Sequence, residues 1–117
     1  IKTVQDLNAV IDTVSSPRKH NLLSRVYQAL RIAVNGEYVN LKQLMGSGLQ
    51  ALAVGGKLLV ITFHSGEEAI VQSYFERVVQ NGEAVYEYDS KYIQPSVDEL
   101  RDNFNAHSAK LWAIKKK

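Results

Sequence analysis

The sequence predicts an α/β fold with about three strands and flanking helices. Three features support this prediction: a continuous apolar, β-branched segment at residues 57–63, a glycine pair directly before it, and amphipathic helical patterns on both sides of it. A short apolar run bounded by turn residues is typical of a strand that is buried on both faces of an α/β sheet. We therefore expect residues 57–63 to form such a strand, with one helix leading into it and another leaving it.

Three helices are expected before this strand, because apolar residues recur there at helical spacing. Thr3 and Asp6 form a capping-box pair at the start of the first helix, which ends at a Ser-Ser-Pro break at positions 15–17. Asn35 and Gly36 end the second helix. Two glycines inside the third helix each cost about 1 kcal/mol relative to alanine. The expected ranges are residues 4 to about 14, 22–34 and 38–52.

The segment after the strand predicts a helix, a short strand, a short helix and a final strand. Ser65 and Glu68 form a second capping-box pair, so the helix leaves the strand through His64 and Ser65. Pro95 and Ser96 are start signals for the short helix. The expected ranges are residues 65–79, 84–88, 96–103 and 109–114, the last followed by three terminal lysines.

Composition limits the classes of protein to which the chain can belong. Its 117 residues, 45% of them apolar, suit one globular α/β domain, which we expect over residues 1–117. The absence of cysteine excludes disulfides and thiolate metal sites. A net charge of +2 does not by itself indicate a nucleic-acid binder, and the longest apolar run, residues 58–63, is too short to cross a membrane. The first residue is Ile1, which indicates a trimmed or processed chain or a fragment.

Three segments carry distinctive patterns: SRVYQALRIAVN at residues 24–35, GGKLLVITFHS at residues 55–65, and Pro95, Ser96, Glu99 and Asn103 followed by SAKL at residues 108–111. In order and spacing they resemble TRxFQALRIAVN, PGGRLxVISFHS and TPSxxEIxxNPRxRSAKLR, three motifs of the bacterial-type 16S rRNA cytosine-N4 methyltransferase family (MraW type). The resemblance covers nearly the whole chain. Residues 1–20 resemble the end of the family's helical insertion, and residues 21–117 resemble the C-terminal part of its sheet.

The resemblance implies the C-terminal portion of a Rossmann-like class I methyltransferase fold. Members of this family transfer a methyl group from S-adenosylmethionine to the exocyclic N4 of a cytidine in small-subunit rRNA. The cofactor motif belongs to an N-terminal half, which this sequence lacks. The glycines of this sequence also indicate that the cofactor motif is absent. A cofactor site needs a glycine-rich turn directly after a strand. Gly46 and Gly48 lie in a helix pattern instead, and Gly55 and Gly56 precede their strand. We therefore assign no cofactor residue, expect no S-adenosylmethionine binding by this chain alone, and leave open whether it is an enzyme.

His64 and Ser65 are candidates for substrate or RNA binding, because α/β sheets bind ligands just outside the carboxyl ends of their strands. The alternative is structural: Ser65 only caps the helix and His64 packs under a loop. No catalytic residue is assigned, since neither residue has a partner at the spacing of a hydrolytic triad. The three histidines also lack metal-ligand spacing, so no metal site is expected.

Four further side chains are candidates for contacts with RNA. Arg25, Gln28 and Arg31 recur every three residues and form one polar stripe on their helix, which either holds phosphates or faces solvent. Lys110, together with the three terminal lysines, either extends a basic surface toward RNA or precedes a frayed tail.

Two groups of residues depart from the family pattern. After the His-Ser pair, the family's Leu, Asp and Arg are replaced by Gly66, Glu68 and Ala69. In the closing motif, arginines of the family are replaced by Asn105, His107 and Trp112. Each lost phosphate contact lowers the salt dependence of RNA binding by a slope of about 0.9 or less, so we expect weaker binding to rRNA.

The sequence leaves the function open between a partial chain of the methyltransferase, inactive alone, and a catalytically inactive rRNA-binding or ribosome-assembly factor. A third possibility is an α/β remnant without an RNA partner. Expected partners are small-subunit rRNA or a ribosomal assembly intermediate. A missing N-terminal half, a second copy or a protein partner is also expected, to cover the exposed hydrophobic edge of the 57–63 strand. No membrane partner is expected, and the expected location is the cytoplasm, with the mitochondrial matrix as the alternative.

Overall fold

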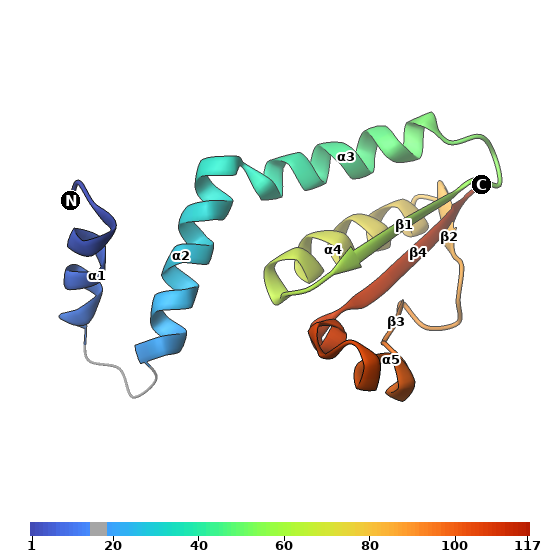
Figure 1. Cartoon of the computed structure of the whole chain (residues 1–117). Helices are drawn as coiled ribbons and strands as arrows, with labels where there is room; N and C mark the ends of the chain where they lie inside the picture. Colours follow the sequence, from blue (N-terminus) through green and yellow to red (C-terminus); the bar gives the residue numbers. More distant parts are fainter. Residues whose placement is uncertain (15–18) are drawn as a thin grey trace. The chain divides into compact units, whose positions relative to one another are not determined.

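The computed structural model describes residues 1–14 and 19–117, apart from the side chains of residues 19–21 (Figure 1). The predicted helix break at positions 15–17 lies outside the described residues. The chain forms two compact units, Ile1–Glu37 and Tyr38–Lys117. The described elements are α1 (Val4–Asp12), α2 (Lys19–Asn35), α3 (Glu37–Ala51), β1 (Lys57–Thr62), α4 (Ser65–Gln80), β2 (Ala84–Tyr86), β3 (Tyr92–Ile93), α5 (Val97–Asp102), the 3₁₀ helix η1 (Phe104–Ser108) and β4 (Lys110–Lys116).

The first unit begins with the predicted capping box. Thr3 Oγ1 accepts the Asp6 N–H at 3.1 Å, and Asp6 Oδ2 accepts the Thr3 N–H at 3.1 Å, so both halves of the box are confirmed. The Lys2 N–H donates to the same carboxylate at 2.9 Å, and these backbone donors hold the pKa of Asp6 below its usual value. The Tyr27 hydroxyl donates to Asn8 Oδ1 and thereby ties α2 to α1.

The second unit contains an antiparallel sheet in which every pairing is made with β4. The strand order is β1-β4-β2, and β3 also pairs with β4. Val60 lies opposite Trp112, and Ala84 lies opposite Lys116. Because β1 and β2 are both antiparallel to β4, they run in the same direction. The α/β class is confirmed, while β3, which is only two residues long, had no predicted counterpart.

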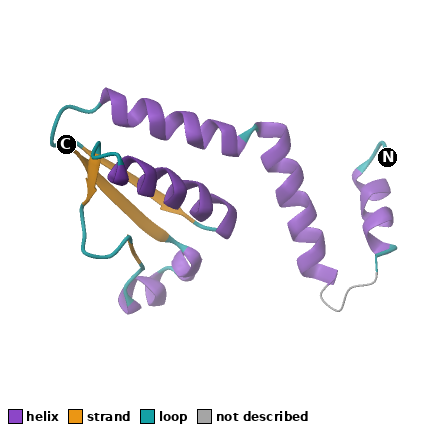
Figure 2. Cartoon of the chain, turned by 180° about the vertical axis from the view of Figure 1, so that it is seen from behind, coloured by secondary structure: helices purple, strands orange, loops and turns teal. Residues whose placement is uncertain are grey.

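One face of the sheet carries the hydrophobic core. Figure 2 shows α4 lying across the strands on this face. The buried side chains come from α3, α4, β2 and β4; they are Met45, Leu49, Val71, Phe75, Val78, Ala84, Trp112 and Ile114. Leu58 and Val60 of β1 pack against this cluster.

The prediction that the 57–63 strand is buried on both faces is wrong. Successive side chains of a strand point to opposite faces, and α3 and α4 cover only one of them. Leu59 is 53% exposed, Ile61 57% and the following Phe63 51%. β1 is also the end strand of the described sheet order, so the expected exposed hydrophobic edge is confirmed.

The C-terminal lysines are not a frayed tail. β4 continues through Lys116, two residues beyond the predicted end of the strand, and the Lys117 N–H donates to the Glu83 carbonyl at 3.1 Å. Lys116 Nζ donates to the carbonyls of Leu52 at 2.8 Å and Gln50 at 3.2 Å. The carbonyls at the end of a helix have no partner within the helix, and Lys116 supplies donors to those of α3.

A buried polar pair joins β1 to β4. Trp112 Nε1 donates to Thr62 Oγ1 at 2.9 Å, and Thr62 and Trp112 are 0% and 2% exposed. The indole ring also contacts Tyr92, with ring centroids 5.0 Å apart. The expectation that Trp112 marks a lost contact with RNA is therefore wrong, because its side chain lies inside the core.

Removing the acceptor of this hydrogen bond should weaken the fold. Thr62→Val keeps the shape of the side chain but leaves the buried indole N–H unpaired, so the free energy of unfolding should fall by about 1–3 kcal/mol in urea titrations. Thr62→Ser, which retains the hydroxyl, serves as the control and should lose about 1 kcal/mol for the buried methyl group. In a Trp112→Phe background the cost of Thr62→Val should shrink, and equal costs in both backgrounds would show that the bond contributes nothing.

Candidate functional site

The turn between β1 and α4 is built by a reciprocal cap on His64, not on Ser65. His64 Nδ1 accepts the Glu67 N–H at 3.4 Å, and Glu67 Oε2 accepts the Phe63 N–H at 2.9 Å. The predicted capping box of Ser65 and Glu68 is wrong, because the chain uses the pair one residue earlier, at the same spacing of three. Ser65 is the first residue of α4 and is exposed.

His64 presents both ring nitrogens to Glu67. Since Nδ1 accepts a hydrogen bond, the neutral ring carries its proton on Nε2. Nε2 is buried and lies 3.4 Å from Glu67 Oε1, although the geometry is not that of a hydrogen bond. These contacts hold the imidazole as part of the helix cap. A role of His64 or Ser65 in substrate binding stays a prediction.

Tyr38 fills the space beside Gly66. A Cβ atom at position 66 would lie 2.8 Å from Tyr38 Cζ and closer still to the Tyr38 hydroxyl. The Tyr38 ring also lies near the His64 ring, with centroids 6.1 Å apart. The departure at position 66, where the family pattern has Leu, is thus matched by a tyrosine that occupies the space of the missing side chain.

Lys110 lies at the same end of the sheet, directly opposite Thr62 in the β1–β4 register. Its Nζ is 3.0 Å from Glu68 Oε2 and 4.6 Å from the centroid of the Tyr92 ring. The side chain is 24% exposed. Lys110 therefore makes an internal ion pair and a cation–π contact, and its predicted contact with RNA stays a prediction.

The polar stripe of α2 belongs to the first unit. Arg31 Nε lies 3.1 Å from Glu37 Oε1, and Arg25 is exposed while Gln28 is half-buried. The structure brings His64, Ser65 and Lys110 together at one end of the sheet. Arg25, Gln28 and Arg31 form a separate group in the other unit.

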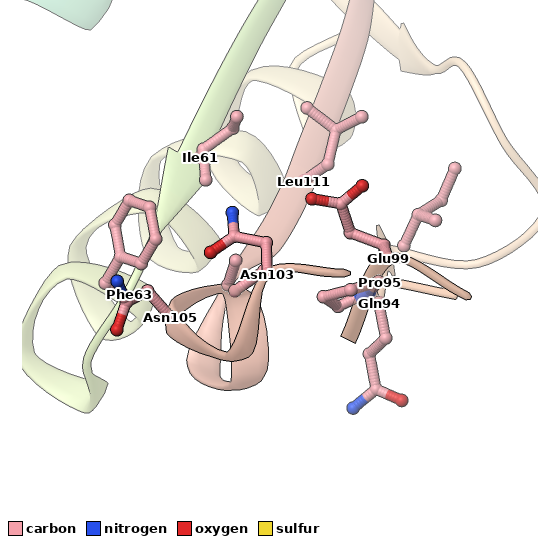
Figure 3. Close-up of a pocket in the computed structure, with 11 residues that line it drawn as sticks. Ile61, Phe63, Gln94, Pro95, Glu99, Asn103, Asn105 and Leu111 are labelled. Atoms are coloured by element: carbon pink, nitrogen blue, oxygen red, sulfur yellow. The ribbon is translucent and has the colours of Figure 1, made fainter. Parts of the chain in front are cut away.

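A hollow of about 530 Å³ lies at the same end of the sheet (Figure 3). Its floor comes from the carboxyl end of β1 and the start of β4, where Ile61 pairs in register with Leu111. Its rim comes from α5 and the segments on either side of it. The lining residues are Ile61, Phe63, Ile93, Gln94, Pro95, Glu99, Asn103, Asn105, Ala106, Ala109 and Leu111.

Sequence reasoning missed the residues of this hollow as a site. Glu99 and Asn103 entered only as parts of a motif, and Phe63 only as the end of a strand. One signal was available: residues 59, 61 and 63 are apolar at every second position, which marks a second apolar face of the strand. The convergence of α5 and η1 on that face depends on tertiary structure.

Neither a metal centre nor a membrane span emerges from the described residues. Within residues 1–14 and 19–117, no three His, Asp or Glu side chains cluster so that they could hold a metal ion. None of the described helices is long and apolar enough to cross a membrane.

Comparison with known proteins matches residues 1–117 of this chain to one family, which is described as the MraW methylase family. Ribosomal RNA small subunit methyltransferase H of Dictyoglomus turgidum is 38% identical over 92% of this chain and 36% of its own length. The proteins of the same name from Mycoplasmopsis pulmonis and Borrelia garinii subsp. bavariensis are 41% and 40% identical, over 85% and 99% of this chain. The chain spans 36% to 39% of the length of these relatives.

The contact between Tyr38 and Gly66 predicts opposite effects for the same substitution at two helical glycines. Gly66→Ala should lower the free energy of unfolding by about 1–3 kcal/mol, because the new methyl group displaces the Tyr38 ring. Gly46→Ala is the matched control: no atom lies within 4 Å of its Cβ position, so it should raise stability by about 1 kcal/mol. In a Tyr38→Ala background, Gly66→Ala should no longer destabilise; an unchanged cost in urea titrations would contradict this account.

Proposed function

Because the chain belongs to the MraW methylase family, we propose that it is the C-terminal part of an S-adenosylmethionine-dependent rRNA (cytosine-N4) methyltransferase of the small ribosomal subunit, inactive alone. The observation that carries the proposal is the family match over residues 1–117, joined to relatives named ribosomal RNA small subunit methyltransferase H. Residues 1–20 are then the end of the family's helical insertion. The substrate, small-subunit rRNA, puts the protein in the bacterial cytoplasm, with the mitochondrial matrix as the alternative.

The uncovered side of the sheet supports the proposal that a further part of the protein packs against it. A Rossmann-like sheet is covered by helices on both faces, whereas Leu59 and Ile61 are about half exposed here and β1 has a free edge in the described sheet. The curated relatives are more than twice as long as this chain. We propose that the part of the protein that matches the rest of their length adds a strand to β1 and covers the apolar face up to the hollow, which stays open.

The described residues do not fit the cofactor. S-adenosylmethionine needs converging backbone N–H groups at a glycine-rich turn between a strand and a helix. The glycines with positive φ are Gly36, Gly55 and Gly82, and each follows a helix. We therefore derive no step through the cofactor on this chain and assign its binding to the missing part.

The alternative function is a catalytically inactive rRNA-binding or ribosome-assembly factor. It is favoured by positions 69 and 105, where the family pattern has arginine and this chain has the exposed residues Ala69 and Asn105. Both proposals share the RNA partner, so methyl transfer separates them.

Methyl transfer can be tested with a chimaera. We would replace the matching third of the Mycoplasmopsis pulmonis relative with this chain and measure N4-methylcytidine in small-subunit rRNA by mass spectrometry. The chimaera should bind S-adenosylmethionine and methylate the RNA, whereas this chain alone should show no saturable binding in calorimetry. A chimaera that binds the cofactor and leaves cytidine unmodified would support the inactive factor instead. Saturable binding by the chain alone would contradict the missing cofactor site.

The uncovered face predicts self-association of the isolated chain. Leu59→Lys and Ile61→Lys put charge on this face and should reduce oligomers in sedimentation velocity without loss of stability, because neither side chain packs into the core. Leu58→Lys puts the same charge on the covered face and should unfold the protein. Oligomers that persist in the Leu59→Lys, Ile61→Lys double variant would show that another surface associates.

A further inference from the structure

We infer that the hollow at the carboxyl end of β1 binds an unstacked cytosine base of RNA, with Phe63 as the stacking ring and Glu99 as the acceptor of the exocyclic amine. The inference rests on the proposed function for the RNA partner, and it adds the residues that recognise the base.

The hollow has the size and floor of a site for a planar, mainly apolar ligand. Its volume of about 530 Å³ lies within the ~300–1,000 Å³ that is typical of small-molecule sites and exceeds that of one base, so a base can enter with its ribose. Ile61 and Leu111 form the apolar floor. Phe63, 51% exposed, stands at the edge, and proteins stack unpaired RNA bases on aromatic rings in this position.

Polar side chains converge on this floor without partners. Glu99 and Asn103 are four residues apart, and their backbone is fixed: Ser96 Oγ accepts the Glu99 N–H at 3.1 Å, and the Glu99 carbonyl accepts the Asn103 N–H at 2.7 Å. Figure 3 shows the Glu99 carboxylate pointing toward Leu111 and the Asn103 amide between Glu99 and Phe63. Within the described part of the chain, no hydrogen bond or ion pair engages the side chains of Glu99, Asn103 or Asn105. All three residues are exposed and make no internal contact of this kind, so their polar groups are available to a ligand.

The charges around the hollow favour a base over a phosphate. Glu99 is the one charged residue in the described lining. The nearby cations are engaged elsewhere, Lys110 with Glu68 at 3.0 Å and Arg101 with Asp98 at 3.7 Å. A phosphate would be repelled by the carboxylate, whereas the exocyclic amine of cytosine donates to it. Uracil carries a carbonyl oxygen at the same position, so the carboxylate disfavours it.

Adenine also carries an exocyclic amine, and it is part of S-adenosylmethionine. The test therefore includes both sources of the same chemistry. Amide spectra of the ¹⁵N-labelled chain are recorded during titration with cytidine, uridine and S-adenosylhomocysteine. Cytidine should shift the signals of Phe63, Glu99 and Asn103 saturably and bind about tenfold more tightly than uridine, the discrimination that one good base-edge contact gives.

A matched pair of variants isolates the carboxylate. Glu99→Gln should abolish the preference for cytidine, whereas Asp98→Asn removes the same charge from the same helix and should leave the preference unchanged. Phe63→Leu should weaken cytidine and uridine alike. Amide dispersion equal to that of the parent chain confirms that each variant is folded.

Three results would overturn the inference: equal affinity for cytidine and uridine, tighter binding of S-adenosylhomocysteine than of cytidine, or shifts confined to residues outside the hollow.

A second measurement works at low protein concentration, where self-association is suppressed. A short RNA that contains 5-iodocytidine should crosslink to Phe63 when it is illuminated, and mass spectrometry would map the attached residue. Attachment to a residue outside the hollow would contradict the site. Neither measurement needs methyl transfer, so the two proposals can fail separately. Base binding without methylation would contradict only the proposed enzyme activity. Methylation without base binding in the hollow would contradict only the proposed binding site.

Discussion

Every strand pairing of the described sheet runs through β4, and the rest of the second unit depends on that strand. Trp112 and Ile114 of β4 enter the core, and Trp112 also donates to Thr62 of β1. At one end, Lys110 pairs with Glu68 of α4, and at the other Lys116 donates to the final carbonyls of α3. The strand that is last in sequence thus joins the three other strands of the described sheet and the two covering helices, α3 and α4. The unit cannot be complete until its C-terminus has paired.

α3 and α4 cover one face of this sheet, and the second unit is therefore asymmetric. Leu58 and Val60 pack under the helices, while Leu59 and Ile61 of the same strand stay half exposed. Large apolar surfaces of this kind mark sites of interaction, since water disfavours them. The end of the apolar face that carries α5 and η1 is different, because polar side chains without partners rise above the apolar floor there. The proposed protein partner would cover most of this face, and the proposed base would bind at its polar-rimmed end.

Much of the secondary structure could be predicted from local pattern, because apolar spacing and caps act within a few residues. The capping box at Thr3 and the helix stop at Gly36 are of this kind. Three errors had tertiary causes. The cap of α4 shifted to His64, where Glu67 closes the reciprocal cap and Glu68 is left to pair with Lys110. The apolar run of β1 was taken for burial on both faces, although periodicity cannot show whether a second layer exists. The site at Glu99 and Asn103 needs two segments to meet across the sheet, and no local pattern contains that information.

The departures from the family pattern do not all bear on RNA. Gly66 and Trp112 each have an internal counterpart, Tyr38 in one case and Thr62 in the other, so these changes report repacking inside the fold. Asn105 has no counterpart within the described residues and lines the hollow, where the family pattern has arginine. A divergent residue bears on ligand recognition only when its side chain can reach the ligand, and among positions 66, 105 and 112 only position 105 lies at the proposed site.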